Sequence, residues 1–307
     1  MSVKPAILLM AYGSPARLDD MRDFLRDVRG GREPTDALVA EMTERYRQAG
    51  GSPLNERTAE QAEAVREALR RRGAERPVHV GMRHGPPRIR EAIAAMTREG
   101  LREATAIALA PHASDLSTDR YRAQVEEAVA EGAPIRFRFV REWWRQPALN
   151  AWWTGQIREG LQRMLRAGGD APHLLFTAHS LPVRARNAGD AYERQLRDHA
   201  ALLAEQTGWT DGSFAFQSAG ASPEPWLGPS IGEVLRELAA RGRRRVLVAP
   251  IGFVCDHIEI LYDLDIEAQR EARALGLEMA RTPMPNGASL LADAVADAVR
   301  EEEARTA

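Results

Sequence analysis

The chain has 307 residues, of which 44% are hydrophobic and 28% are charged. This composition is typical of a soluble globular protein and excludes an intrinsically disordered chain. The 42 Lys and Arg residues are balanced by 44 Asp and Glu residues, so the chain lacks the basic surplus of a nucleic-acid-binding protein. At about 150 residues per domain, the length predicts two domains.

The apolar runs at 6–11 and 246–254 are far shorter than the roughly 20 residues that cross a bilayer. We therefore expect a cytoplasmic protein with no integral membrane segment. Cys255 is the single cysteine, so the chain can form neither an internal disulfide nor a cysteine-ligated iron–sulfur cluster. Any metal ion must be bound by His, Asp, Glu or Tyr side chains.

Short apolar runs alternate with longer amphipathic stretches along the chain. The runs predict strands at Ala6–Ala11, Val78–Met82, Thr105–Ala110, Ile135–Val140, Leu174–Ala178, Phe214–Gln217, Arg245–Pro250 and Leu277–Ala280. The stretches predict helices at Thr58–Arg72, Tyr121–Glu131, Ala191–Gln206 and Ile231–Arg241. This alternation indicates an α/β fold of parallel sheets with helices on both faces.

The same order of four strands and polar segments occurs twice. Tyr12 follows the first strand of the first half, and His179 follows the first strand of the second half. We predict two Rossmann-like domains related by this pseudo-repeat, at residues 1–150 and 151–307, each a four-stranded parallel sheet flanked by helices. Because ligands of open α/β sheets bind beyond the carboxyl ends of the strands, the two halves define a cleft between them.

His179 stands directly after an apolar strand and before a Ser-Leu-Pro turn. A neutral imidazole there is placed to bind a metal ion or to accept a proton near pH 7. A structural histidine that caps or fills the strand end is the alternative, and this segment alone does not separate the two.

Glu259, Asp263 and Glu267 are spaced i, i+4 and i+8 in a segment predicted to begin a helix, with Asp256 as its N-cap. The spacing places three carboxylates on one helix face, and like charges at this spacing cost about 0.2–0.5 kcal/mol per pair. An Arg side chain or a metal ion would offset this repulsion. A solvated acidic face is the alternative, but the adjacent His257 favours metal binding.

A loop at Gly50-Gly51-Ser52-Pro53 permits close approach of a ligand to the backbone. The chain has no G-x-x-x-x-G-K-[ST] phosphate loop, and it has no G-x-S-x-G or H-E-x-x-H motif of hydrolases and zinc proteases. The tryptophan pairs at 143–144 and 152–153 either fill the contact between the halves or form a wall for a flat hydrophobic ligand.

Together these segments resemble the ferrochelatase family over nearly the whole chain. The most specific marks are His-Ser-Leu-Pro at 179–182 and Gly-Phe-x-x-Asp-His-x-Glu-x-Leu-Tyr-Asp at 252–263. Tyr12 and the Ala-Pro-His-x-Ser segment at 110–114 are most similar to the soluble coproporphyrin III type of Gram-positive and related bacteria. The resemblance implies insertion of ferrous iron into a porphyrin held in the cleft, with no ATP, cofactor or redox change.

The resemblance also implies roles for individual residues. His179 and Glu259 match the catalytic metal-site pair, and Tyr12 matches an axial ligand to the product iron on the opposite face of the porphyrin. The residues that match contacts to the macrocycle or its propionates are Arg29, Arg45, Tyr46, Ser52 and Tyr121. An outer cation site is implied at Arg45, Asp263 and Glu267.

Three other functions stay open at this point. The chain could be a chelatase for protoporphyrin or sirohydrochlorin, a non-catalytic haem carrier that uses Tyr12 as its ligand, or a two-domain binding protein for a sugar or nucleotide. For the favoured function, the partners are coproporphyrin III and ferrous iron, with transient contact to an enzyme that processes the product. We expect a monomer, because two halves already complete the cleft.

Overall fold

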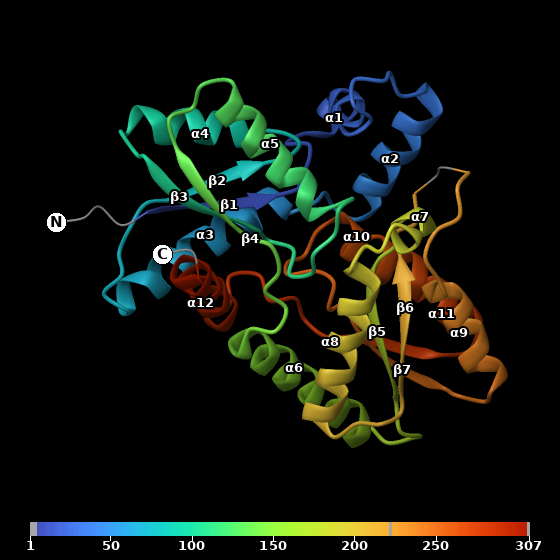
Figure 1. The fold of residues 1–307 in the computed structure, drawn as a ribbon. Helices are drawn as coiled ribbons and strands as arrows, with labels where there is room; N and C mark the ends of the chain where they lie inside the picture. Colours follow the sequence, from blue (N-terminus) through green and yellow to red (C-terminus); the bar gives the residue numbers. More distant parts are fainter. Residues whose placement is uncertain (1–4, 221–222, 306–307) are drawn as a thin grey trace.

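Two lobes, each around one parallel sheet, make up the computed structural model, which describes residues 5–220 and 223–305 (Figure 1). The first lobe contains β1 (Ala6–Ala11), β2 (Val78–Met82), β3 (Glu103–Ala108) and β4 (Arg136–Val140). The second contains β5 (His173–His179), β6 (Gly212–Gln217), β7 (Arg245–Ala249) and β8 (Glu278–Arg281). All eight predicted strands are present, with ends that shift by up to two residues.

The helices of the first lobe are α1 (Met21–Val28), α2 (Asp36–Gln48), α3 (Leu54–Arg71), α4 (Ile89–Arg98) and α5 (Thr118–Ala130). They are followed by α6 (Pro147–Arg166), α7 (Val183–Asn187), α8 (Tyr192–Thr207), α9 (Ile231–Ala240), α10 (Ile258–Leu261), α11 (Gln269–Ala274) and α12 (Ser289–Arg305). A 3-10 turn covers Leu18–Asp20, and a π-helix covers Asp263–Ala268 between α10 and α11.

The strand order is β2-β1-β3-β4 in the first sheet and β6-β5-β7-β8 in the second, and every pair is parallel. If β5 to β8 are counted as strands one to four of their own sheet, the second sheet has the same strand order as the first. This confirms the predicted fold class and the pseudo-repeat. It also makes β1 and β5 topological equivalents, each at the point where the strand order reverses and where open α/β sheets bind ligands.

The residues of β1 explain why the first sheet is covered on both sides. Ile7 and Leu9 belong to one hydrophobic cluster, whereas Leu8 and Met10 belong to another, and all four are fully or almost fully buried. Side chains alternate between the two faces of a strand, so each cluster lies on its own face. Such continuous apolar strands are typical of parallel sheets sandwiched between helices.

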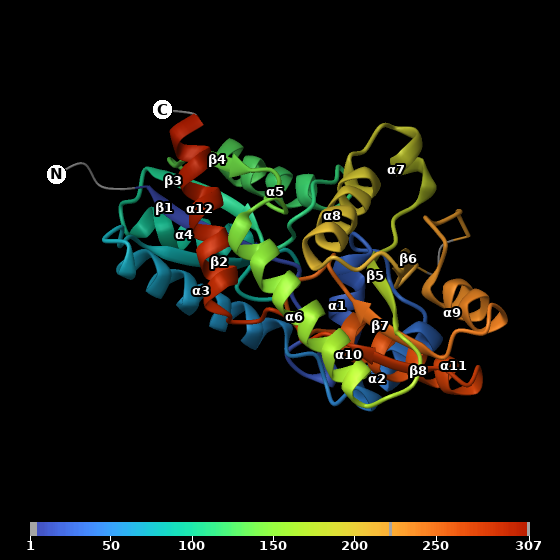
Figure 2. The same cartoon turned by 90° about the horizontal axis from the view of Figure 1, so that it is seen from below.

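The C-terminal helix α12 does not stay with the second lobe. It packs against α3, β3 and β4 of the first lobe and against α6, so the second lobe's chain ends on the first lobe's sheet (Figure 2). The predicted boundary at 150/151 falls in the first turn of α6, which starts at Pro147. The buried cluster that holds Ile7 and Leu9 continues into the second lobe through α12 and α6, so one core spans both lobes.

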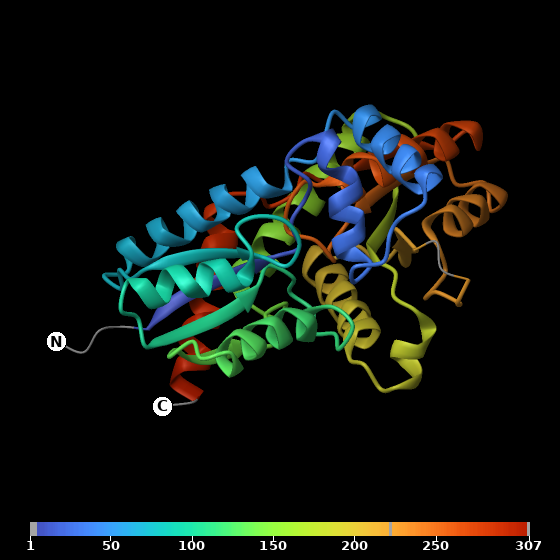
Figure 3. The same ribbon diagram turned by 90° about the horizontal axis from the view of Figure 1, so that it is seen from above.

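The α1–α2 pair reaches from the first lobe over the second (Figure 3). Met21 and Leu25 of α1 pack with Tyr46 of α2, and Ile258 of α10 packs against the same cluster. The α1–α2 pair therefore brings Tyr46 next to α10, which carries Glu259.

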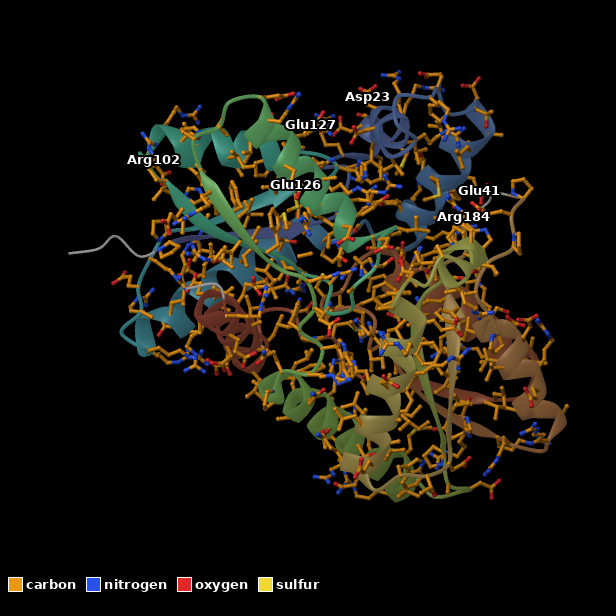
Figure 4. All side chains as sticks on the ribbon, viewed as in Figure 1. Asp23, Glu41, Arg102, Glu126, Glu127 and Arg184 are labelled. Atoms are coloured by element: carbon orange, nitrogen blue, oxygen red, sulfur yellow. The ribbon has the colours of Figure 1, made fainter. Side chains whose placement is uncertain are left out.

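Charged side chains such as Asp23 and Glu127 lie at the periphery of the molecule (Figure 4).

Candidate active site

Residues from both lobes meet beyond the carboxyl ends of the two sheets. Tyr12 follows β1, His179 ends β5, and Glu259 lies in α10 in the segment after β7. Tyr12 is 39% exposed, and the His179 and Glu259 side chains are 33% and 32% exposed. A ligand can therefore reach all three side chains.

His179 and Glu259 form one hydrogen-bonded unit. The distance from His179 Nδ1 to Glu259 Oε2 is 2.9 Å. The Nε2 atom of His257 lies 3.6 Å from the same carboxylate oxygen, while its Nδ1 contacts the Cys255 carbonyl at 3.0 Å. Because Nδ1 of His179 is engaged, its Nε2 is the ring nitrogen left for a ligand.

His179 and Glu259 each favour the ionised form of the other. Burial disfavours the His179 imidazolium, but the charge of Glu259, its hydrogen bond and the charge of Asp263 raise the pKa of His179. Burial likewise opposes ionisation of Glu259, yet His179 and His257 hold the pKa of that carboxyl well below its usual range. The pair therefore carries an imidazolium and a carboxylate at pH values where a free histidine has begun to lose its proton.

Three tyrosines of the first lobe lie within electrostatic range of Glu259. Burial raises the pKa of Tyr12 to about 12, an effect that Arg83 opposes and the Glu259 charge reinforces. Burial raises the pKa of Tyr46 to about 12, again with a contribution from Glu259. Burial also raises the pKa of Tyr121, which lies within electrostatic range of Arg83, Tyr12 and Glu259. The structure thus brings together Tyr12, Tyr46, Tyr121, His179 and Glu259, which the sequence predicted as one site.

Two further residues fix the backbone of the His179–Glu259 unit. The Tyr192 hydroxyl donates to the His179 carbonyl at 3.1 Å. The Gln217 amide donates to the Glu259 carbonyl at 2.9 Å and accepts from the Thr177 hydroxyl at 2.8 Å. Sequence reasoning gave neither Tyr192 nor Gln217 a role. The position of Gln217 at the carboxyl end of β6 was the available signal.

Glycines let the loops of this site approach one another. Gly13 has φ +90°, and a Cβ there would lie 1.6 Å from the His84 carbonyl oxygen. A Cβ on Gly252 would lie 2.4 Å from the Ala178 Cβ, directly beside His179. Only glycine fits at both positions, so these two contacts fix how closely the site loops pack.

The residues predicted to contact the propionates differ in their exposure and in the contacts that they make. The Arg45 guanidinium pairs with Glu41 at 2.9 Å and lies over the Tyr262 ring at 5.2 Å, so it joins α2 to the second lobe. The Ser52 hydroxyl is buried and has no hydrogen-bond partner within the described residues. Arg29 is exposed at the C-terminus of α1, and none of its contacts in the described part of the chain reaches the other predicted residues.

The acidic row continues from Glu259 through a π-helix. Glu267 N donates to the Tyr262 carbonyl at 2.9 Å, the i→i−5 bond of a π-helix rather than the regular turn expected from the sequence. Burial and the charges of Glu259 and Glu267 raise the pKa of Asp263 to about 6, against a hydrogen bond from Ser218 and the charge of Arg45. The three carboxylates therefore lie within electrostatic range of one another.

A hollow of about 270 Å³ runs beside this row. Ser180, Ser218, Asp263, Glu267 and Glu271 are among its lining residues. Arg236 pairs with Glu271 at one side of the hollow. Glu271 lies four residues beyond the row of Glu259, Asp263 and Glu267. Within the row, the charge of Arg45 opposes the rise in the pKa of Asp263, so an arginine offsets part of the repulsion.

The expected N-cap role of Asp256 is wrong. His257 occupies the N-cap position of α10 and makes no side-chain cap bond. The Asp256 carboxylate instead accepts from Arg281 at 3.1 Å and from Asn286 at 2.7 Å. Arg281 also binds Asp265 of the π-helix at 2.7 Å. Hydrogen bonds to a guanidinium are stronger than those to a backbone N–H, which explains why Asp256 binds Arg281 and does not cap α10.

Within residues 5–220 and 223–305, no group of three or more His, Cys, Asp or Glu side chains is arranged to hold a metal ion. The same part of the chain contains no helix with the length and apolar character needed to cross a membrane. His179 and Glu259 form a pair of potential metal ligands, one fewer than such a group requires.

The architecture matches metal chelatases of known structure. SirB from Bacillus subtilis with Fe3+ superposes with a TM-score of 0.60 at 14% identity, covering 99% of this chain and 97% of that one. The sirohydrochlorin chelatase SirB from Bacillus subtilis subspecies spizizenii, in complex with cobalt, gives a TM-score of 0.56 at 12% identity and covers 98% and 95%. At these identities the similarity shows the fold alone, which is the two-lobed chelatase fold.

Sequence relatives define the family. The family model for Ferrochelatase matches residues 4–303. A Ferrochelatase of Deinococcus radiodurans is 40% identical over 305 residues, covering 98% of this chain and 96% of the relative. A Coproporphyrin III ferrochelatase of Geobacillus kaustophilus is 37% identical over 298 residues, covering 95% and 94%. The chain belongs to the ferrochelatase family, whose chemistry is the insertion of iron into a porphyrin.

Proposed function

We propose that this ferrochelatase inserts ferrous iron into coproporphyrin III and releases Fe-coproporphyrin III, with no resident cofactor. The observation that carries the proposal is the meeting of Tyr12 from the first lobe with the His179–Glu259 unit of the second. A flat macrocycle between them would offer one face to each. Relatives at 35% and 37% identity that are named Coproporphyrin III ferrochelatase support the choice of porphyrin.

Metal insertion requires iron to lose water and two pyrrole N–H protons to leave. Glu259 stays ionised because His179 and His257 lower its pKa, so it is available as a carboxylate to receive iron or relay a proton. His179 presents Nε2 to the macrocycle. When the ring is neutral, with Nδ1–H directed at Glu259 Oε2 2.9 Å away, Nε2 accepts a pyrrole proton, and the Glu259 carboxylate stabilises the imidazolium that forms. Tyr192 and Gln217 hold the backbone of this pair, so its geometry is set before the substrate arrives.

Tyr12 contributes from the opposite face, where its phenol can ligate the product iron. The acid groups of the porphyrin bind at the rim of the site. We assign them to Arg29, Arg45, Tyr46, Ser52 and Tyr121. The Ser52 hydroxyl, which has no hydrogen-bond partner within the described residues, fits this role, because a buried hydroxyl without a partner is unfavourable until a ligand accepts a hydrogen bond from it.

The choice of porphyrin is tested by comparing coproporphyrin III with protoporphyrin IX under anaerobic conditions. We expect kcat/KM for iron insertion to be at least about tenfold higher with coproporphyrin III, because four carboxylates make more charge-assisted contacts than two. Equal values, or a preference for protoporphyrin IX, would show a general ferrochelatase.

We assign Asp263 and Glu267 to an outer cation site that concentrates iron near Glu259. Replacing both by alanine is expected to raise the iron concentration at half-maximal rate several-fold while sparing kcat. Because the pKa of Asp263 is raised to about 6, the wild-type iron requirement should also rise as the pH falls through that value. The double variant should lose this pH dependence.

The control for the outer site is Glu237→Ala, which removes an exposed carboxylate paired with Arg241 on α9. It should leave the iron dependence unchanged. If the Asp263/Glu267 double variant instead melts at a lower temperature and keeps the wild-type iron dependence, the two carboxylates serve only to hold the π-helix.

A further inference from the structure

Arg83 stands at the carboxyl end of β2, the strand beside β1. Its backbone N–H donates to the Ala11 carbonyl at 2.8 Å, directly before Tyr12. Its guanidinium lies 5.7 Å from the centre of the Tyr12 ring and 5.8 Å from the centre of the Tyr121 ring. The cation is therefore held between two tyrosines of the active site.

Among the residues that the structure describes, no carboxylate lies close enough to pair with Arg83. Within the described residues its guanidinium forms no ion pair with a carboxylate, although the side chain is half-buried. Other arginines withdrawn from solvent are paired: Arg76 with Glu303, Arg245 with Glu278 and Arg281 with Asp265. Burying a cation without a partner is unfavourable, so the two aromatic faces compensate Arg83 only in part.

The charge of Arg83 also acts on the two tyrosines electrostatically. Arg83 counteracts the rise in the pKa of both Tyr12 and Tyr121, so its charge is felt at both phenols. Within the part of the chain that the structure describes, the Arg83 guanidinium makes no side-chain hydrogen bond or ion pair, so its N–H donors are available to bind a carboxylate in pairs. A substrate with ionised acid groups is the ligand that completes this arrangement.

We propose that Arg83 is a substrate-binding residue that holds one carboxylate of the porphyrin from the Tyr12 side of the site. The proposal rests on the proposed function in that the ligand is a porphyrin with acid side chains. It adds a cation from the loop after β2 to the contacts assigned above. It also gives Tyr12 and Tyr121 a second role, because both rings lie within cation–π distance of the guanidinium.

The test measures binding of coproporphyrin III to the full-length protein by quenching of porphyrin fluorescence. Arg83→Gln should weaken binding by about 10- to 100-fold, the scale of one charge-assisted bond to a carboxylate. Arg83→Lys should recover part of the loss, because it restores the charge without the paired donors. Coproporphyrin III tetramethyl ester, which has no ionised group, should bind wild type and Arg83→Gln equally.

The matched control is Arg88→Gln on the same loop, since Arg88 already pairs with Asp27 at 2.9 Å. It should change the affinity for coproporphyrin III by less than about threefold, under 1 kcal/mol by the same conversion. The proposal is overturned if Arg83→Gln binds the acid as wild type does, or if it loses affinity for the ester to the same extent. If Arg83→Gln loses affinity for coproporphyrin III but not for its ester, the proposal is supported. This holds even if the wild-type protein prefers protoporphyrin IX, because that preference would reject only the proposed choice of porphyrin.

Discussion

His179→Ala and Glu259→Gln are each expected to lower kcat for iron insertion by about 10²-fold or more, the scale of a positioned acid–base group. His179→Ala removes one partner of the 2.9 Å hydrogen bond that joins the two side chains, whereas Glu259→Gln keeps an amide oxygen that can accept this bond. The histidine variant loses the ring nitrogen that faces the macrocycle, and the glutamine variant loses the carboxylate charge. Single-turnover insertion of ferrous iron under anaerobic conditions measures the effect.

Porphyrin affinity should remain within a few-fold of wild type in both variants, because neither side chain is assigned to the acid groups. His173→Gln is the matched control, since His173 lies at the other end of β5 and bonds Asp211 and Ser213. Its turnover per folded molecule should equal that of wild type. A His179 or Glu259 variant that turns over at the wild-type rate would remove both residues from the chemistry.

Glu303→Ala is expected to destabilise the protein by about 3–5 kcal/mol, the usual effect of leaving one member of a buried ion pair alone. The Arg76 guanidinium binds both Glu303 oxygens, at 2.7 and 2.9 Å, and its side chain is only 6% exposed. The Thr105 hydroxyl of β3 donates to the same carboxylate at 2.8 Å. This contact fastens α12 to the first lobe, so its loss should loosen the connection between the lobes.

Chemical unfolding followed by circular dichroism measures the change in free energy. Glu126→Ala, which removes an exposed carboxylate paired with Arg122, should change stability by less than about 1 kcal/mol. The double variant Arg76→Met with Glu303→Leu should recover most of the loss, because it leaves no unpaired charge. Equal effects of Glu303→Ala and Glu126→Ala would show that the α12 contact is not a stabilising pair.

Much of the fold could be predicted because its signals are local. Each strand is a short apolar run, and β1 was predicted to the residue because every position from Ala6 to Ala11 is apolar and buried. The pseudo-repeat then placed Tyr12 and His179 at equivalent strand ends, which the shared strand order confirms. The strand β3 ends two residues early, at Ala108, shortly before Pro111, which has no N–H for the ladder.

The features that sequence reasoning missed depend on contacts distant in the chain. Nothing near α12 shows that it returns to the first lobe, because its partner Arg76 is more than 200 residues away. Arg281 of β8 binds Asp265 of the π-helix, a contact that the sequence around Asp265 does not reveal. Arg83 was visible after a strand, but its place between Tyr12 and Tyr121 and its lack of a counter-ion among the described residues exist only in the folded chain.

Iron insertion by this protein is tested most directly by the amount of Fe-coproporphyrin III formed per protein molecule, with ferrous iron and coproporphyrin III in excess under anaerobic conditions. An enzyme that inserts iron at the His179–Glu259 unit should form many equivalents of product, and Glu259→Gln should form almost none in the same time. Product that stops at one equivalent, with wild type and Glu259→Gln alike, would contradict the account and show a protein that only binds the metallated ring.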